Sequence, residues 1–188
     1  MHRFTYVLAA TFMAAVQVGC TDAARVSEPR SVAAASNASL DAIGTVRRVE
    51  ILDACDPTSF DAVFGVGTCI RQGGRNLFDF IDEVSAKGKA DAWRFAPGNI
   101  EARVGQTLLA VNDGGENHTF TEVEKFGGGL NSTLNELSHN PDVAPECNSS
   151  TLIAAGGSQT EHLDEPGTEL YQCCIHPWMR TTVTVRGT

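Results

Sequence analysis

Near the carboxyl-terminal end of the chain, three side chains that bind soft metals recur at intervals of three residues. Cys173, His176 and Met179 offer a thiolate, an imidazole and a thioether. Together these ligand types select copper over hard cations. If an amino-terminal signal is removed, as argued below, Met179 is the only methionine that remains. The pattern therefore predicts a copper site in this segment.

A trigonal copper site needs a second imidazole, and His118 can supply it. This residue follows the Gly114-Gly115 pair, which predicts a turn, and stands at the start of a predicted strand. Two histidines and one cysteine in a plane, with a distant axial methionine, form the geometry of electron-transfer copper. A lone histidine, cysteine or methionine would be read as a surface, disulfide or core residue. The joint pattern favours copper, although zinc also accepts histidine and cysteine ligands.

The elements that must position these ligands are mostly strands. Short apolar runs separated by Gly and Pro predict strands at 45–54, 93–95, 100–104, 107–112, 119–123, 151–155, 159–163, 169–174 and 181–185. Many short strands at close spacing indicate a sandwich or a barrel. One helix is predicted at 76–87, where the apolar residues are Leu77, Phe78, Phe80, Ile81 and Val84, with Gly88 as its cap. Residues 124–150 are expected to form a long surface loop with one helical turn.

The segment from Tyr171 to Met179 resembles the ligand loop of the cupredoxins, the blue copper proteins that include plastocyanin, azurin and amicyanin. Its Cys-x-x-His-x-x-Met spacing is similar to the short loop of amicyanin, and residues 181–185 match the closing strand. The resemblance covers residues 92–188. It implies an all-β fold, a Greek-key β-sandwich, with one type 1 copper site. By the same resemblance the copper ligands are His118, Cys173, His176 and Met179.

Two positions near the predicted ligands depart from the family pattern. Thr119 stands where the family often has an asparagine that braces the site, so a hydroxyl replaces an amide. Ile175 stands where plastocyanin and amicyanin often have proline, so an additional backbone N–H could point at the sulfur of Cys173.

Six cysteines have to be assigned. If Cys20 carries a lipid and Cys173 binds copper, the remaining four allow three pairings, and an oxidising compartment would pair them. The short loop favours Cys55 with Cys69, which leaves Cys147 with Cys174. Because adjacent strand residues face opposite sides, Cys174 would point away from the copper.

The first twenty residues have the pattern of an export signal, with a short basic start and an apolar run from Tyr6 to Gly19. The following Cys20 completes a sequence that resembles a lipobox, which predicts lipidation, and ordinary cleavage nearby, for example after Ala23, is the alternative. We therefore expect an exported protein, periplasmic or at the cell surface, anchored by lipid.

The mature chain is expected to have three parts. Residues 21–44 are rich in small polar residues and predict a flexible tether. Residues 45–91 are predicted to be an N-terminal addition with one strand and one helix, and residues 92–188 the cupredoxin domain.

The net charge and the absence of certain motifs exclude several classes of function. The 188-residue chain has a formal net charge of −9, which argues against nucleic-acid binding. Hydrolase triads, phosphate loops and dinucleotide fingerprints do not appear in the sequence. We therefore expect an electron-transfer protein rather than an enzyme, a one-electron carrier whose copper alternates between Cu(II) and Cu(I).

The expected partner is a redox protein that docks near His176 and Trp178, with Trp178 as an apolar rim around an exposed imidazole edge. The alternative is a copper-holding or protein-binding cell-surface module without a dedicated electron-transfer role. His139 and His162 lie in polar segments and are interpreted as solvated.

Overall fold

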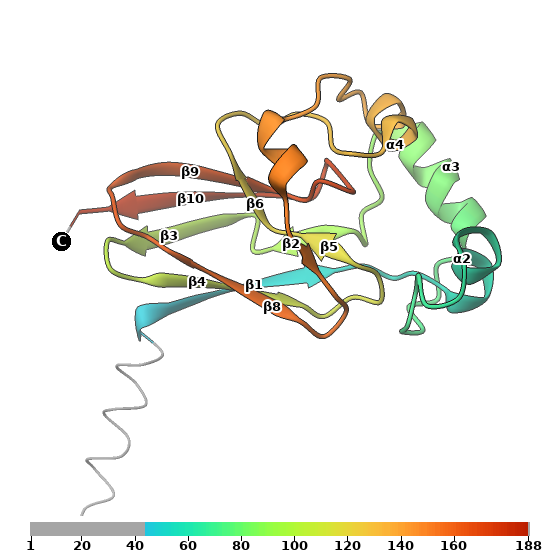
Figure 1. Ribbon diagram of the computed structural model, residues 1–188, viewed down its shortest axis with the longest axis horizontal. Coiled ribbons are helices and arrows are strands. Elements are labelled where there is room, and N and C mark those ends of the chain that lie inside the picture. Colours follow the sequence, from blue (N-terminus) through green and yellow to red (C-terminus); the bar gives the residue numbers. More distant parts are fainter. Residues whose placement is uncertain (1–43, 188) are drawn as a thin grey trace, which may run out of the picture.

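The structure, a computed structural model, describes residues 44–187. They form two four-stranded sheets with helices gathered at one end, and the carboxyl terminus lies at the other end (Figure 1). The predicted export signal, the lipidation site Cys20 and residues 21–43 of the predicted tether lie outside the described residues. Within residues 44–187, no helix has the length and apolar character that crossing a bilayer requires.

The first sheet has the strand order β2-β1-β4-β8. Its strands are β1 (Val46–Leu52), β2 (Arg94–Ala96), β4 (Thr107–Asn112) and β8 (Ser158–His162). The inner strand β1 runs parallel to β4 and antiparallel to β2, and β8 pairs antiparallel with β4.

The second sheet has the order β3-β10-β9-β6. Its strands are β3 (Asn99–Arg103), β6 (Thr121–Val123), β9 (Gly167–Gln172) and β10 (Arg180–Arg186). A short antiparallel pair joins β5 (His118–Thr119) to β7 (Leu152–Ile153). The predicted all-β sandwich is thus confirmed.

Alternation along β4 and β10 contributes to the core between the sheets. On β4, Leu108 and Ala110 are buried and their neighbours are half-buried, and on β10 Val183 and Val185 are buried between less buried neighbours. Because strand side chains point to opposite faces in turn, this period of two leaves one apolar face on each of these two strands. Those faces pack against each other as a single cluster.

The helix predicted over 76–87 is confirmed as α3 (Leu77–Lys87). Asn76 caps its first turn by accepting a hydrogen bond from the Asp79 amide at 2.9 Å, and the chain leaves it through Gly88 with φ of 72°. The buried face holds Leu77, Phe80 and Val84. Phe78, which the sequence pattern assigns to the same face, is instead 76% exposed. Two residues along a helix correspond to a rotation of about 200°, so Phe78 points away from the side that buries Phe80.

Three short elements differ from the sequence prediction. Helix α2 (Pro57–Phe64) was missed because eight residues give too few turns for a clear period, although Asp56 caps it and Pro57 opens it. The segment 124–150 holds both α4 (Ser132–Leu137) and a 3-10 helix, η1 (Pro145–Ser149), instead of one helical turn.

Residues 45–91 differ most from expectation, because they are part of the sandwich rather than an addition to it. Strand β1 lies inside the first sheet and has partners on both edges. The two helices of the segment, one more than predicted, contribute Phe60 and Phe80, whose rings lie 6.0 and 4.5 Å from that of Trp93. Both rings belong to the main core cluster.

Both favoured disulfides are present. Cys55 pairs with Cys69 and Cys147 with Cys174, with Cα atoms 6.1 and 5.4 Å apart. Among the described cysteines Cys173 is free and buried. The two disulfides therefore leave free the thiol of Cys173, which the sequence analysis predicts to bind a metal.

Candidate metal centre

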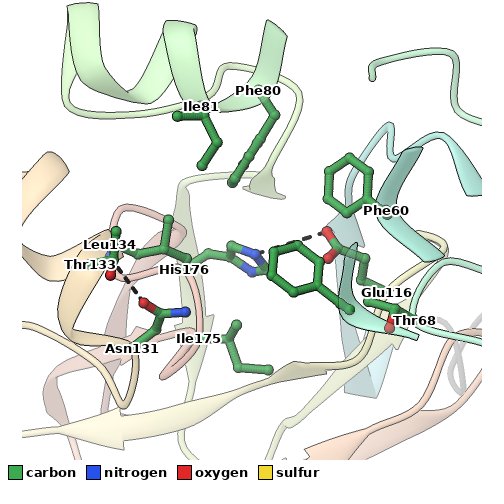
Figure 2. A pocket seen from close by; sticks show the side chains of 11 residues that line it. Phe60, Thr68, Phe80, Ile81, Glu116, Asn131, Thr133, Leu134, Ile175 and His176 are labelled. Atoms are coloured by element: carbon green, nitrogen blue, oxygen red, sulfur yellow. Dashed lines mark hydrogen bonds and ion pairs between the residues drawn. The ribbon is translucent and has the colours of Figure 1, made fainter. Parts of the chain in front are cut away.

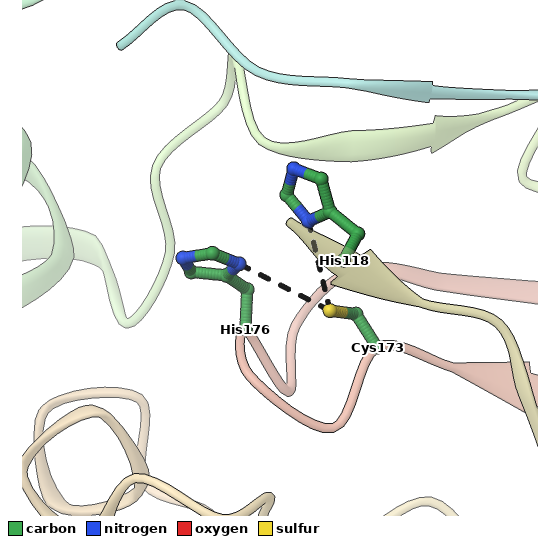
Figure 3. Close-up of side chains that lie close together, drawn as sticks. All are labelled: His118, Cys173 and His176. Carbon is green, nitrogen blue, oxygen red and sulfur yellow. Dashed lines mark hydrogen bonds between the residues drawn. The ribbon is translucent and has the colours of Figure 1, made fainter. Parts of the chain in front are cut away.

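Three of the four predicted ligands converge in the structure. His118, Cys173 and His176 are buried, and their ligand atoms all lie within 4.8 Å of one another (Figure 3). The sulfur of Cys173 is 3.7 Å from Nδ1 of His118 and 4.0 Å from Nδ1 of His176. Two imidazole nitrogens thus face one thiol sulfur.

The short β5–β7 pair and the second sheet bring these groups together. His118 lies on β5, Cys173 follows the end of β9, and His176 and Met179 belong to the turn between β9 and β10. The amide of Cys173 donates a hydrogen bond to the carbonyl of Met179 at 3.0 Å. The amide of Met179 donates one to the carbonyl of His176 at 2.9 Å. Met179, the fourth predicted ligand, is fully buried within the same closed turn.

The far nitrogen of His118 meets a carboxylate that the sequence analysis did not single out. Oδ2 of Asp53 lies 2.9 Å from Nε2 of His118, and the Asp53 side chain is 1% exposed. The same oxygen accepts hydrogen bonds from the amides of Gly115 and Glu116 at 2.8 and 3.0 Å. A histidine held at Nε2 in this way keeps its ring orientation and presents Nδ1 to a metal.

The Gly114-Gly115 turn is required by this contact. A Cβ atom on Gly114 would collide with the carboxylate of Asp53, and one on Gly115 with the sulfur of Cys55. Glycine is the residue that lets another group approach the backbone closely, so this pair was the available sequence signal. The glycine pair indicates that another group packs closely against the turn, but it does not identify that group as Asp53.

Charge and hydrogen bonding shift the titration of this pair. Burial alone would raise the pKa of Asp53, but hydrogen bonds from His118 and from the amides of Glu116 and Gly115 outweigh it and lower the pKa to about 2. Burial would lower the pKa of His118, but its hydrogen bonds with Asp53 and Cys173 raise it to about 10.

A second buried carboxylate lies beside His176. Oε2 of Glu116 is 3.9 Å from Nε2 of His176 and accepts a hydrogen bond from the indole of Trp93 at 2.6 Å. Desolvation raises the pKa of Glu116. Each of the two histidines therefore has its Nδ1 toward the sulfur and a carboxylate near its Nε2.

The donor set fits copper. Burial would raise the pKa of the Cys173 thiol, but hydrogen bonds and charge from His118 and His176 outweigh it and hold the pKa well below its usual value. A thiolate with two imidazoles, whose Nδ1 atoms must be free of protons when a metal binds, suits copper, and also zinc, better than hard cations. The residues present thus match what the fold would need to hold the metal.

Thr119 and Ile175, the two positions that depart from the family pattern, differ in whether they form hydrogen bonds near the ligands. The hydroxyl of Thr119 accepts a hydrogen bond from the amide of Cys174 at 2.8 Å, so this position still braces the ligand loop. In the described part of the chain, no hydrogen bond joins the Ile175 amide to the sulfur of Cys173. The amide that replaces a proline is therefore not directed at the thiol.

The expectation of an exposed imidazole edge is wrong. His176 is 3% exposed, and rings from other elements surround it. Its centroid lies 6.1 Å from that of Phe80 on α3, 6.5 Å from that of Trp93 and 5.6 Å from that of Trp178. Trp178 is half-buried and belongs to this aromatic cover.

His139 and His162 are exposed, as expected, and neither joins the cluster. The candidate metal centre thus contains two of the four histidines that the structure describes.

Comparison with known proteins places the chain in a copper-binding family. Residues 82–186, more than half of the chain, match the family described as copper binding proteins of the plastocyanin/azurin family. No curated protein sequence matches.

Among solved structures, a purple cupredoxin from Nitrosopumilus maritimus is 17% identical, with a TM-score of 0.43, over 74% of this chain and 98% of that one. A Cu(I) variant of amicyanin is 20% identical, with a TM-score of 0.36, over 52% and 76% respectively.

Proposed function

Because the chain belongs to the plastocyanin/azurin family of copper-binding proteins, we propose that it carries single electrons. The proposed ligands are His118, Cys173, His176 and Met179. Copper held there supplies a couple between Cu(II) and Cu(I). The observation that carries the proposal is the approach of two imidazole Nδ1 atoms to one buried thiol sulfur.

The residues around the ligands support electron transfer because they leave the donor atoms little freedom to move. Asp53 holds the ring of His118, and backbone hydrogen bonds close the turn that carries Cys173, His176 and Met179. The Cys147–Cys174 disulfide ties the next residue of that turn to η1. Ligands that keep their positions in both oxidation states lower the cost of reorganisation on electron transfer.

Burial supports a carrier rather than an enzyme. Cys173, His118 and Met179 are fully buried, and His176 is nearly so. We propose that no substrate reaches the metal itself and that electrons enter and leave through the protein around it.

We also propose export, attachment through lipidated Cys20 and a redox protein as partner. We propose that the partner docks at the end of the molecule that carries the helices, because the aromatic cover over His176 lies there. Exposed apolar side chains lie there, with Val63 and Phe64 on α2 and Phe78 on α3 exposed by 61%, 59% and 76%. A brief complex with few polar contacts suits such a surface.

The spectrum of the copper-loaded protein tests the function and the ligand set. We expect an intense visible band that bleaches on reduction, because a thiolate bound to Cu(II) absorbs strongly. Cys173→Ser should remove the band. Met179→Gln is the matched control, since it keeps the thiolate and should retain a copper site with a shifted potential. Persistence of the band in Cys173→Ser would refute the assignment.

A copper-holding module is the second candidate, and the covered edge of His176 favours it. A buried edge slows electron exchange between molecules. NMR line broadening in mixtures of the Cu(I) and Cu(II) forms would separate the two candidates. Fast self-exchange supports the carrier, and slow exchange with rapid release of copper to a chelator supports the holding module.

A further inference from the structure

We propose that a cavity beside His176 binds a small aromatic molecule that carries a hydrogen-bond donor, such as a phenol. The cavity has a volume of about 320 Å³. It lies where α2, α3 and α4 meet the turn that carries the ligands, and the imidazole of His176 forms part of its wall (Figure 2).

Aromatic and aliphatic side chains make up most of the wall. Phe60 and Phe64 come from α2, Phe80 from α3, Leu134 from α4 and Ile175 from the ligand turn. An engineered apolar cavity of roughly 150 Å³ is enough to bind benzene. A space of this size with several phenyl rings around it therefore accepts one substituted aromatic ring.

One acceptor in the wall is left without a donor. Glu116 is 8% exposed, and its Oε2 accepts the indole N–H of Trp93. Within residues 44–187, no hydrogen bond reaches its other oxygen, Oε1. This oxygen is not among the side-chain atoms enclosed without a partner, so it remains open to solvent. A donor on the ligand would replace water there and add a directional hydrogen bond to the apolar contacts.

The arrangement is that of a small-molecule site, a mostly apolar cavity with few polar groups that fix orientation. Phe64 and Thr133 are exposed wall residues, so the cavity reaches the surface between α2 and α4. A bound ring would lie against His176. The proposal rests on the proposed function only in that His176 is a metal ligand, and the binding itself needs no copper.

Fluorine NMR of the full chain loaded with zinc in place of copper tests the site without redox chemistry. We expect 4-fluorophenol to give a saturable shift. 4-Fluorotoluene, which lacks a donor, should bind about tenfold more weakly, the factor that corresponds to about 1.4 kcal/mol.

Two variants on α4 form a matched pair for the same titration. Thr133→Trp places a large side chain in the cavity and should weaken binding of 4-fluorophenol by about tenfold or more. Ser132→Trp adds the same ring to an exposed position that does not line the cavity, and it should change binding by less than about twofold. If Thr133→Trp fails to fold, Thr68→Trp, at another wall position, replaces it.

Three results would overturn the proposal. They are the absence of saturation with 4-fluorophenol, equal affinity for 4-fluorotoluene, and unchanged binding in the folded cavity-filling variant. None of them depends on the visible spectrum of the copper protein. A blue protein that fails this titration would therefore remove the small-molecule site and leave the carrier proposal standing.

Discussion

Among single residues, Asp53 joins His118 to the backbone around it. Its Oδ2 meets His118 and two backbone amides, and its Oδ1 accepts the amide of Cys55 at 3.1 Å. Replacing the carboxylate by an amide weakens the hold on the ring of His118. We expect Asp53→Asn to lower copper affinity by about 10-fold to 100-fold, measured by competition with a chelator.

A surface aspartate provides the control for that experiment. Asp113 pairs with Arg48 at 2.7 Å, and its side chain is 37% exposed. Exposed ion pairs contribute about 0 to 1 kcal/mol, so Asp113→Asn should leave copper affinity unchanged. Equal affinities for the Asp53 and Asp113 variants would show that Asp53 does not position His118.

The two tryptophans near His176 differ in their hydrogen bonding. Trp93 donates to Glu116, whereas the indole N–H of Trp178 is buried and has no partner in the described part of the chain. A double-mutant cycle of Trp93→Phe with Glu116→Gln should give a coupling energy of about 1 to 2 kcal/mol, measured by chemical unfolding of the metal-free protein. The cycle of Trp178→Phe with Glu116→Gln should give none. Similar coupling in both cycles would mean that packing, and not the hydrogen bond, links these residues.

Among the elements, helix α3 matters most to the site because it covers His176. Phe80 contacts Trp93, Trp178 and His176, whereas Phe78 on the same helix is 76% exposed. We expect Phe80→Ala to lower the free energy of unfolding by about 3 to 5 kcal/mol and to speed removal of copper by a chelator.

Phe78→Ala is the matched control on that helix. It removes the same side chain from a solvent-facing position, where a substitution changes stability by about 0.5 kcal/mol or less. If both variants released copper at the wild-type rate, the aromatic cover would not govern access to His176.

At the scale of the whole molecule, the amino-terminal strand and the helices are part of one folding unit. Strand β1 lies between β2 and β4, so its removal would expose one edge of each neighbour and open the core. We expect a chain that begins at residue 92 to remain unfolded by circular dichroism and by NMR dispersion. A chain that begins at residue 44 should fold, and folding of the shorter chain would restore the division at residue 92.

Local chemistry determined much of this protein from its sequence. The three-residue spacing of Cys173, His176 and Met179 predicted the ligand turn, because a tight turn brings such neighbours together without help from the rest of the fold. The short loop between Cys55 and Cys69 favoured one disulfide and left Cys147 with Cys174 for the other, and helical spacing predicted α3. Short apolar runs divided by Gly and Pro indicated a sandwich or a barrel, because each run is too short for a helix.

Tertiary structure alone decided what surrounds the ligands. The contact between Asp53 and His118 joins residues 65 positions apart, and it depends on the parallel register that sets Ile51 of β1 opposite Asn112 of β4. The cover over His176 likewise depends on where α3 docks. Local patterns show which face of an element is apolar, but not the partner it meets, because that choice is made by the packing of segments distant in sequence. The sequence therefore predicted the metal ligands, while the carboxylates, the cover and the cavity emerged only with the fold.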